Sequence, residues 1–381
     1  MKKVLFLQIK GKSKAGVWYV NKTIGEELIK KGYDVSILSI RNNPEDITLE
    51  HVPKLHLHTI NEKDLWEISR KRDIKSFKSL KKYIKEHKDL KKDYEKAKQY
   101  IRNINPDYII ASHYQCLDFV PKEYYSKTVH EQHSSMKDVL HVKSNFKTIK
   151  KYSGKIFGFI WLSEETKKQA NLLKIKNNYC LYNPVRFSTK NIADVTKNKK
   201  LVCITRIENR QKRINLMIKI ADQVLKKNSE WSFELYGSGI IDHESQIILD
   251  NNPQMKYMGR TEDPEKVLLS SSINMNTSSF EGFSLSILEA SMCGVPTVSF
   301  NSGESVYEEI YDNKSGYIIE DDDDIEEYQR KLDELMNNSK KLIKFSKECK
   351  TFSRNFLKEN IILDWIDLFE KIDKKNISLS R

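Results

Sequence analysis

The chain has 381 residues, a length that suggests two domains of ordinary size. Hydrophobic residues make up 39% of it, enough for packed cores, and no segment approaches the ~20 apolar residues of a membrane span. The formal net charge of +13 predicts attraction to an anionic surface such as acidic lipid, an anionic polymer or nucleic acid.

The five cysteines are scattered and show neither the CxxC spacing of a zinc site nor the pattern of a disulfide framework. This usage favours a reducing compartment, so we expect a cytoplasmic protein. The apolar run at residues 4–9 is too short for a signal peptide and is typical of a first strand.

The N-terminal part begins with a strand at 4–9, an amphipathic helix at 17–31 and a second strand at 35–40. Strand, glycine-containing turn, helix and strand in this order form a βαβ unit of the doubly wound type. The turn at 10–16 carries two glycines and three lysines that could face a phosphate, although it lacks the GK[ST] of a Walker loop.

Residues 62–103 form a lysine-rich helical stretch. Between 70 and 102, 14 basic residues face 5 acidic ones. One interpretation is a basic face that contacts the acidic inner face of the membrane or an anionic polymer. The other is a solvated helical hairpin.

Histidines follow two predicted strands. His113 comes after the strand at 107–111, and His130 and His133 lie in a loop after the strand at 126–129. In open α/β sheets ligands bind at the carboxyl ends of strands, so all three are candidates. A single histidine in such a loop is more often structural. Strands at 155–161 and 178–182, with a helix from near Ser163, complete this part.

The segment Asn183-Pro184-Val185 and the polar residues after it mark a domain boundary. A second βα series follows. Its strands are predicted at 201–205, 233–236, 256–258, 273–275, 297–300 and 316–319, and its helices at 214–226, 242–249, 264–269 and 323–373. The acidic run at 321–324 stands at a helix start, where compensation of the helix dipole explains it better than a metal site.

Two carboxylates, Glu281 and Glu289, flank a predicted junction between a strand and a helix. The first turn of that helix offers unpaired N–H groups and the positive end of a dipole, which suit a phosphate. Carboxylates on either side could accept hydrogen bonds from a ligand with hydroxyls at both ends, such as a nucleotide sugar. The alternative is that Glu281 caps the helix and Glu289 pairs with a surface lysine.

Four motifs in order resemble the GT-B glycosyltransferases of family 4, which retain the configuration of the transferred sugar. They are Arg206 with Lys212, Gly237-Ser238-Gly239, the E-x7-E run EGFSLSILE from Glu281 to Glu289, and Cys293-Gly294-Val295-Pro296 followed by 308–316. The resemblance implies an α/β architecture with two Rossmann-like doubly wound domains that face a central cleft. They would be an acceptor-binding domain at 1–183 and a nucleotide-sugar-binding domain at 184–350, with helices of 351–381 crossing back to the first.

The resemblance also implies residue roles. Arg206 and Lys212 would hold the donor pyrophosphate and stabilise charge on the leaving nucleotide. Glu289 would bind the ribose and Glu281 the transferred sugar, with a histidine near the reacting carbon: His133 first, then His130, then His113. The other donor-binding residues implied are Gly16, Gly237, Gly282, Phe283, Ser284 and Leu285. The chain departs from the family at Ala15-Gly16, where Gly-Gly is common, and at Ser284, where Gly is common.

We therefore expect a retaining, metal-independent hexosyltransferase that needs no cofactor beyond its nucleotide-diphosphate sugar, taken as a UDP-sugar. The acceptor would be a bacterial surface glycan or glycolipid, such as a capsule, a teichoic acid or a lipid-linked saccharide. The alternative is a non-catalytic GT-B-like partner of another transferase or of an anionic polymer, against which the intact Arg206, Lys212, Glu281 and Glu289 set argues. No nucleic-acid-binding motif is present.

Overall fold

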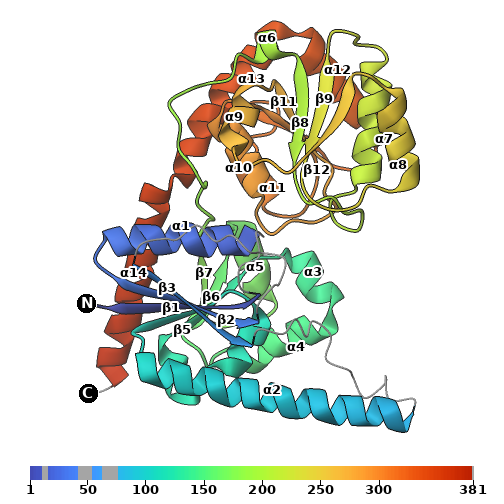
Figure 1. The fold of residues 1–381 in the computed structure, drawn as a ribbon. Helices are drawn as coiled ribbons and strands as arrows, with labels where there is room; N and C mark the ends of the chain where they lie inside the picture. Colours follow the sequence, from blue (N-terminus) through green and yellow to red (C-terminus); the bar gives the residue numbers. More distant parts are fainter. Residues whose placement is uncertain (11–15, 42–53, 62–75, 380–381) are drawn as a thin grey trace.

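The computed structural model describes residues 1–10, 16–41, 54–61 and 76–379. The described residues form two α/β domains, each built on one parallel sheet, and a long C-terminal helix that runs beside the first domain (Figure 1). Within these ranges, none of the helices combines the length and the apolar character that crossing a bilayer requires.

The N-terminal domain holds a seven-stranded sheet with the order β3-β2-β1-β4-β5-β6-β7. The strands are β1 Lys3–Lys10, β2 Asp34–Arg41, β3 Leu55–Asn61, β4 Tyr108–Ala111, β5 Thr128–Gln132, β6 Gly158–Trp161 and β7 Asn178–Cys180. The strand order reverses beside β1, which pairs with both β2 and β4. Such a reversal leaves a crevice at the carboxyl ends of the strands, where α/β proteins bind ligands.

Helices cover both faces of this sheet, which explains why its strands read as nearly continuous apolar runs. Their bounds are α1 Gly16–Lys30, α2 Phe77–Ile104, α3 Met136–His141, α4 Lys143–Tyr152 and α5 Glu164–Leu172, with 3-10 turns η2 Tyr114–Phe119 and η3 Lys122–Lys127. Residues of α1 pack on one face, and residues of α2, η2 and α4 pack on the other. Ser163 accepts a hydrogen bond from the Thr166 N–H and begins α5, as predicted.

The C-terminal domain has a six-stranded parallel sheet with the order β10-β9-β8-β11-β12-β13. Its strands are β8 Lys200–Ile204, β9 Ser232–Tyr236, β10 Met255–Gly259, β11 Ile273–Asn276, β12 Thr297–Phe300 and β13 Gly316–Ile319. Its helices are α6 Val195–Asn198, α7 Ile214–Leu225, α8 His243–Asn251, α9 Pro264–Leu269, α10 Leu285–Met292, α11 Val306–Glu309, α12 Ile325–Asn337 and α13 Ser339–Phe352, followed by the turn η4 Ser353–Phe356.

The last helix, α14 Lys358–Leu379, returns to the N-terminal domain, as the motif resemblance implied. Trp365 packs on Phe6 of β1 with ring centroids 6.3 Å apart. Phe369 stacks on Tyr108 of β4 at 4.1 Å. These aromatic contacts belong to the core cluster on the α1 face of the sheet, so the C-terminus completes the N-terminal domain.

The predicted doubly wound GT-B fold is confirmed, and the differences are local. The edge strand β3 was not predicted, because His56 and His58 dilute its apolar pattern. The predicted strand at 126–129 extends to Gln132, so His130 lies inside β5 rather than in a loop. The predicted helix at 323–373 is broken into α12, α13, η4 and α14. The predicted helical residues 62–75 and the turn residues 11–15 lie outside the described residues.

Candidate functional site

A cleft of about 830 Å³ lies between the two domains and is lined by both. The N-terminal domain contributes the start of α1 and the loop after β5, and the C-terminal domain contributes the loops after β8, β9 and β11. The predicted site residues that line the cleft are Gly16, His133, Arg206, Lys212, Gly237, Glu281, Gly282, Phe283, Ser284, Leu285 and Glu289. The structure thus brings together residues that lie up to 273 positions apart in the chain (Gly16 to Glu289).

The loop after β8 carries the predicted cations and contacts Glu281 directly. The Lys212 ammonium forms an ion pair with the Glu281 carboxylate, which also accepts a hydrogen bond from Gln211 Nε2 at 3.1 Å. Gln211 Oε1 in turn accepts from Arg206 Nη2 at 2.9 Å. Arg206 is exposed to the cleft, whereas the side chains of Lys212 and Glu281 are only 14% and 9% exposed. The four side chains form one network in which the cations and the first glutamate of the E-x7-E run are adjacent.

Gly237 directly follows β9, at the point where the loop after β9 passes the loop after β8. A Cβ atom at this position would lie 1.8 Å from the Thr205 carbonyl oxygen, so only glycine allows this approach. The Ile207 N–H donates to the Ser238 carbonyl at 2.9 Å and holds the two loops together. Gly237 therefore shapes this wall of the cleft through close backbone packing.

The second carboxylate, Glu289, has a partner that the sequence did not reveal. Arg186, in the connection between the domains, donates to Glu289 through both Nε and Nη2. Burial lowers the pKa of Arg186, but the adjacent carboxylate outweighs it and the net shift is upward. The guanidinium also stacks on the ring of Tyr19 from α1, with 4.5 Å between its carbon and the ring centroid. Glu289 is thus neutralised and linked through Arg186 to the other domain.

The turn before α10 is the predicted phosphate site. Ser284 is the N-cap residue, but its side chain makes no cap hydrogen bond. Its N–H donates instead to the Glu309 carboxylate at 2.9 Å, so this predicted ligand contact is already used within the protein. The Phe283 ring packs between Tyr182 and Phe356, with centroids at 5.5 and 5.4 Å. Phe283 thus anchors the turn, and the main-chain donors at the start of α10 remain the ones suited to a phosphate.

Gly282 lies at a close contact between the two domains in the cleft. A Cβ atom there would lie 2.1 Å from the carbonyl oxygen of His133. The loop after β5 and the turn before α10 are therefore in backbone contact. Any side chain at position 282 would push these loops apart.

Glu309 is a fully buried carboxyl behind this turn. Burial raises its pKa from 4.5 to about 7, the Ser284 N–H opposes that shift, and the negative charge of Glu281 adds to it. Its Oε2 atom has no hydrogen-bond partner among the described residues. The pKa of this carboxyl therefore lies near neutral pH, well above that of a solvent-exposed glutamate.

This raised pKa predicts a pH-dependent stability. Between about pH 4.5 and 7 the folded chain holds a proton on Glu309 that the unfolded chain has released, so the free energy of unfolding falls as pH rises through that window. Glu309→Gln removes the titration and should be more stable than wild type at pH 8 by up to about 3 kcal/mol. Urea unfolding at several pH values measures this. Glu326→Gln, at an exposed position of α12, is the control, and an unchanged pH slope in Glu309→Gln would contradict the assignment.

His133 is the predicted histidine that faces the cleft. Its Nε2 atom lies 3.1 Å from Oε2 of Glu131, whose side chain is only 2% exposed. Neither atom makes a well-aligned hydrogen bond with the residues described. The pair places a buried negative charge directly behind the imidazole.

The other two candidate histidines do not line the cleft. His130 is fully buried, and its ring contacts the Ala111 carbonyl at 2.7 Å and Gln132 Oε1 at 2.9 Å. Burial lowers its pKa. Burial also lowers the pKa of His113 to about 3, with the charges of His130 and His133 adding to the shift. Both rings are neutral near pH 7, and of the three candidates the geometry favours His133 for contact with a ligand.

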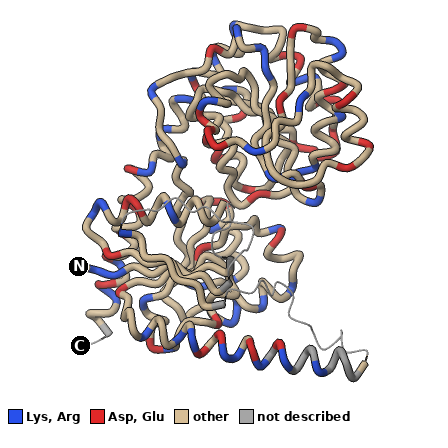
Figure 2. Tube along the Cα trace, viewed as in Figure 1, with Lys and Arg blue, Asp and Glu red and all other residues tan. Residues whose placement is uncertain are grey.

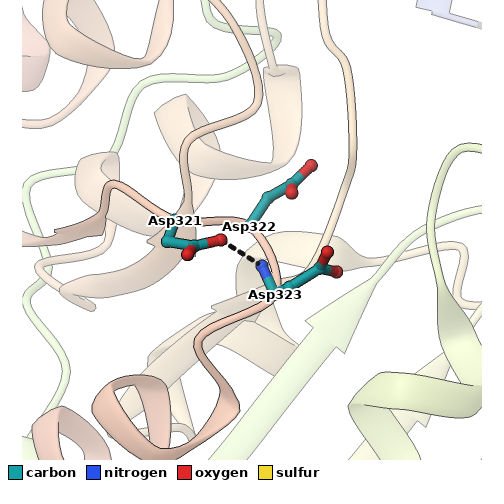
Figure 3. A group of neighbouring side chains, drawn as sticks. All are labelled: Asp321, Asp322 and Asp323. Atoms are coloured by element: carbon teal, nitrogen blue, oxygen red, sulfur yellow. Dashed lines mark hydrogen bonds between the residues drawn. The ribbon is translucent and has the colours of Figure 1, made fainter.

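The acidic run before α12 is predicted from the sequence to compensate the dipole of a helix rather than to bind a metal. One carboxylate oxygen from each of Asp321, Asp322 and Asp323 lies within 4.8 Å of the others (Figure 3). The Asp321 carboxylate accepts a hydrogen bond from the Asp323 N–H at 3.0 Å, and Asp324 caps α12. Arg213 Nη1 lies 3.9 Å from the carboxylates of Asp322 and Asp323. These contacts place the acidic run at the start of α12, beside the guanidinium of Arg213.

Comparison with known proteins agrees with this geometry. The family model described as glycosyl transferases group 1 matches residues 185–352. Residues 185–352, which make up the C-terminal domain, belong to this family. The match covers the C-terminal domain with the Arg206, Lys212, Glu281 and Glu289 network, and it confirms the resemblance of the motifs.

Two curated glycosyltransferases are similar to the chain. Poly(ribitol-phosphate) alpha-N-acetylglucosaminyltransferase of Staphylococcus aureus is 30% identical over 242 residues, which are 62% of this chain and 48% of that protein. Poly(glycerol-phosphate) alpha-glucosyltransferase of Bacillus subtilis is 23% identical over 365 residues, 89% of this chain and 53% of that protein. The chain spans about half the length of these two relatives.

A crystal structure of a S. aureus TarM mutant with fondaparinux, α-GlcNAc-glycerol and UDP has a TM-score of 0.76 to this chain. The sequence identity is 17%, and the superposition covers 97% of this chain and 100% of that one. This similarity confirms the GT-B fold of the chain.

Five residues in or behind this cleft were missed by reasoning from the sequence: Tyr19, Glu131, Arg186, Gln211 and Glu309. Arg186 lies in a segment interpreted only as a domain boundary. Glu131 and His133 are two positions apart at the end of a strand, and such spacing places two side chains on one face. That signal was present in the sequence.

Proposed function

We propose that the protein transfers a hexose from a UDP-sugar to a polyol phosphate polymer of the teichoic acid type, with retention of the anomeric configuration. One observation supports this most: the two cations and the two carboxylates of the family motifs converge in one interdomain cleft of about 830 Å³. A cleft of this volume suits a nucleotide sugar. The named activities of the two curated relatives support the polymer acceptor.

The ion pair between Lys212 and Glu281 is compatible with both of their proposed roles. A lysine ammonium has three donors, so it can hold the Glu281 carboxylate and a donor phosphate oxygen together. Arg206, exposed beside it, supplies a second cation for the diphosphate. As the bond between the sugar carbon and the phosphate oxygen breaks, negative charge grows on UDP, and these cations stabilise it.

Glu289 can bind the ribose without releasing Arg186. An ionised carboxylate offers about four lone-pair sites, of which the guanidinium uses two. The remaining sites can accept hydrogen bonds from two ribose hydroxyls. Arg186 would then fix the orientation of the carboxylate, because both of its contacts are charge-assisted.

The acceptor hydroxyl would attack on the same face of the sugar from which UDP departs. A new bond forms between the anomeric carbon and the acceptor oxygen, and the hydroxyl proton passes to the departing phosphate oxygen. His133 lines the cleft at the Gly282 contact, where it would contact the transferred sugar. Glu131 behind it would favour the ring orientation that donates toward the cleft.

The test is a donor and acceptor screen with the purified chain. UDP-glucose, UDP-N-acetylglucosamine and UDP-galactose are incubated with poly(ribitol phosphate) or poly(glycerol phosphate), and UDP release and product configuration are followed by NMR. We expect release of UDP that depends on polymer and an α-linked product. A β-linked product, or no transfer in any combination, would contradict the proposal.

Capsule and lipid-linked acceptors, and peripheral contact of residues 70–102 with acidic membrane, stay predictions from the sequence. The non-catalytic alternative would show UDP-sugar binding or polymer binding without turnover. The complete set of charged side chains in the cleft supports catalysis over that alternative.

A further inference from the structure

Helix α2 lies on the side of the N-terminal domain opposite the C-terminal domain, and its N-terminal half extends beyond the sheet (Figure 1). None of the residues that line the cleft belongs to it. Its apolar residues Ala97 and Ile101 are fully buried against the domain. The opposite side of the helix carries five exposed lysines at intervals of three or four residues: Lys81, Lys85, Lys88, Lys92 and Lys96. We refer to these five residues as the lysine stripe.

The acidic residues of α2 whose side chains are described lie mostly away from the last four lysines of the stripe. Glu86 and Asp93 are buried on the domain side, and Asp89 is half-buried. Glu95 is exposed, but its carboxylate lies 3.4 Å from Lys98, which is outside the stripe. Within the described part of the chain, no ion pair involves the last four stripe lysines. Figure 2 shows basic and acidic positions alternating along the backbone of α2, so the burial of the acidic side chains decides which charges face the solvent.

The geometry of the stripe is linear. With a rise of about 1.5 Å per residue, successive lysines are about 4.5–6 Å apart along the axis, and the stripe is about 22 Å long. A polyol phosphate chain likewise presents single negative charges in a line at regular intervals. A flat anionic bilayer would be matched better by a broad patch with exposed apolar side chains. On the part of α2 whose side chains are described, no large hydrophobic residue is exposed.

We propose that the lysine stripe is an accessory binding site for the polyanionic acceptor, separate from the cleft. The lysines bind the phosphates in one part of a long polyol phosphate chain, while another part of the same chain reaches the sugar donor in the cleft. This inference rests on the proposed function, since it takes the acceptor to be such a polymer. It adds a second point of attachment, so that chain length determines apparent affinity.

The test compares Lys85→Gln/Lys88→Gln/Lys92→Gln with Lys340→Gln/Lys344→Gln/Lys347→Gln. The control lysines are exposed, have the same kind of helical spacing on α13, and give the same change in net charge. Glutamine preserves helix propensity. For long poly(glycerol phosphate) we expect the stripe variant to raise KM about tenfold, with kcat unchanged, because three exposed phosphate contacts are lost. A single-repeat acceptor should give equal KM in all three proteins.

Binding without turnover separates this inference from the proposed function. Fluorescence anisotropy with labelled long poly(glycerol phosphate) should show weaker binding and a smaller salt dependence for the stripe variant than for the control. If transfer occurs but the stripe variant matches the control with long polymer, the accessory site is wrong while the proposed function stands. If the stripe variant loses binding to vesicles containing phosphatidylglycerol but not to polymer, the occupant is a membrane and the inference is overturned.

Discussion

Lys212→Ala should lower kcat/KM by about 10²–10³-fold, since in the proposed reaction it removes a cation from the position where charge would develop on the leaving nucleotide. Arg206→Ala should have a smaller effect of about tenfold to 10²-fold, because Arg206 is exposed and better screened. Steady-state kinetics with the donor found in the screen measures both. Arg210→Ala is the matched control, since Arg210 is an exposed arginine of the same loop that does not line the cleft.

Lys212 also neutralises Glu281, so the activity loss has two physical causes. Calorimetry with UDP, which lacks the sugar, separates them. A diphosphate role predicts weaker UDP binding in Lys212→Ala. UDP affinity equal to that of wild type, together with the kinetic loss, would contradict that role and leave Lys212 as the partner of Glu281 alone.

Alanine substitutions of the two glutamates of the E-x7-E run should change different kinetic and binding parameters. Glu281→Ala should lower kcat by about 10²-fold with little change in UDP affinity, because its proposed contact is the sugar that moves. Glu289→Ala should weaken UDP and UDP-sugar binding by tenfold or more, because its proposed contact is the ribose. Kinetics and UDP calorimetry on the same preparations measure both. Equal loss of nucleotide affinity in the two variants would refute this division.

Arg186 requires a control for the second variant. Glu289→Ala leaves a mostly buried guanidinium without its carboxylate, which can destabilise the fold on its own. Arg186→Ala/Glu289→Ala removes both charges. If the double variant regains the thermal stability of the wild type but not its UDP affinity, the loss of affinity results from the missing Glu289 carboxylate. It does not then result from an Arg186 guanidinium left without its partner.

The sequence predicted the strands with continuous apolar runs, because both faces of each parallel sheet are covered. It predicted the cations and carboxylates of the cleft because the motif spacing is local. Arg186 and Glu309 were not predicted as site residues. Their importance comes from contacts with Glu289 and Ser284, which lie 103 and 25 positions away in the sequence. His130 was placed in a loop because the last three residues of β5, 130–132, are polar, and the end of a strand is hard to recognise from the sequence when polar residues continue it.

The chain passes between the domains twice, once near Val185 and once near Phe356. These two connections are themselves hydrogen-bonded, since the Val185 N–H donates to the Phe356 carbonyl at 2.8 Å. A buried cluster that includes Phe283 and Leu288 surrounds them. Two adjacent connections are suited to a hinge about which the domains could rotate. Arg186 follows Val185 directly, so its contact with Glu289 lies beside that hinge and would shift less on rotation than groups farther from it.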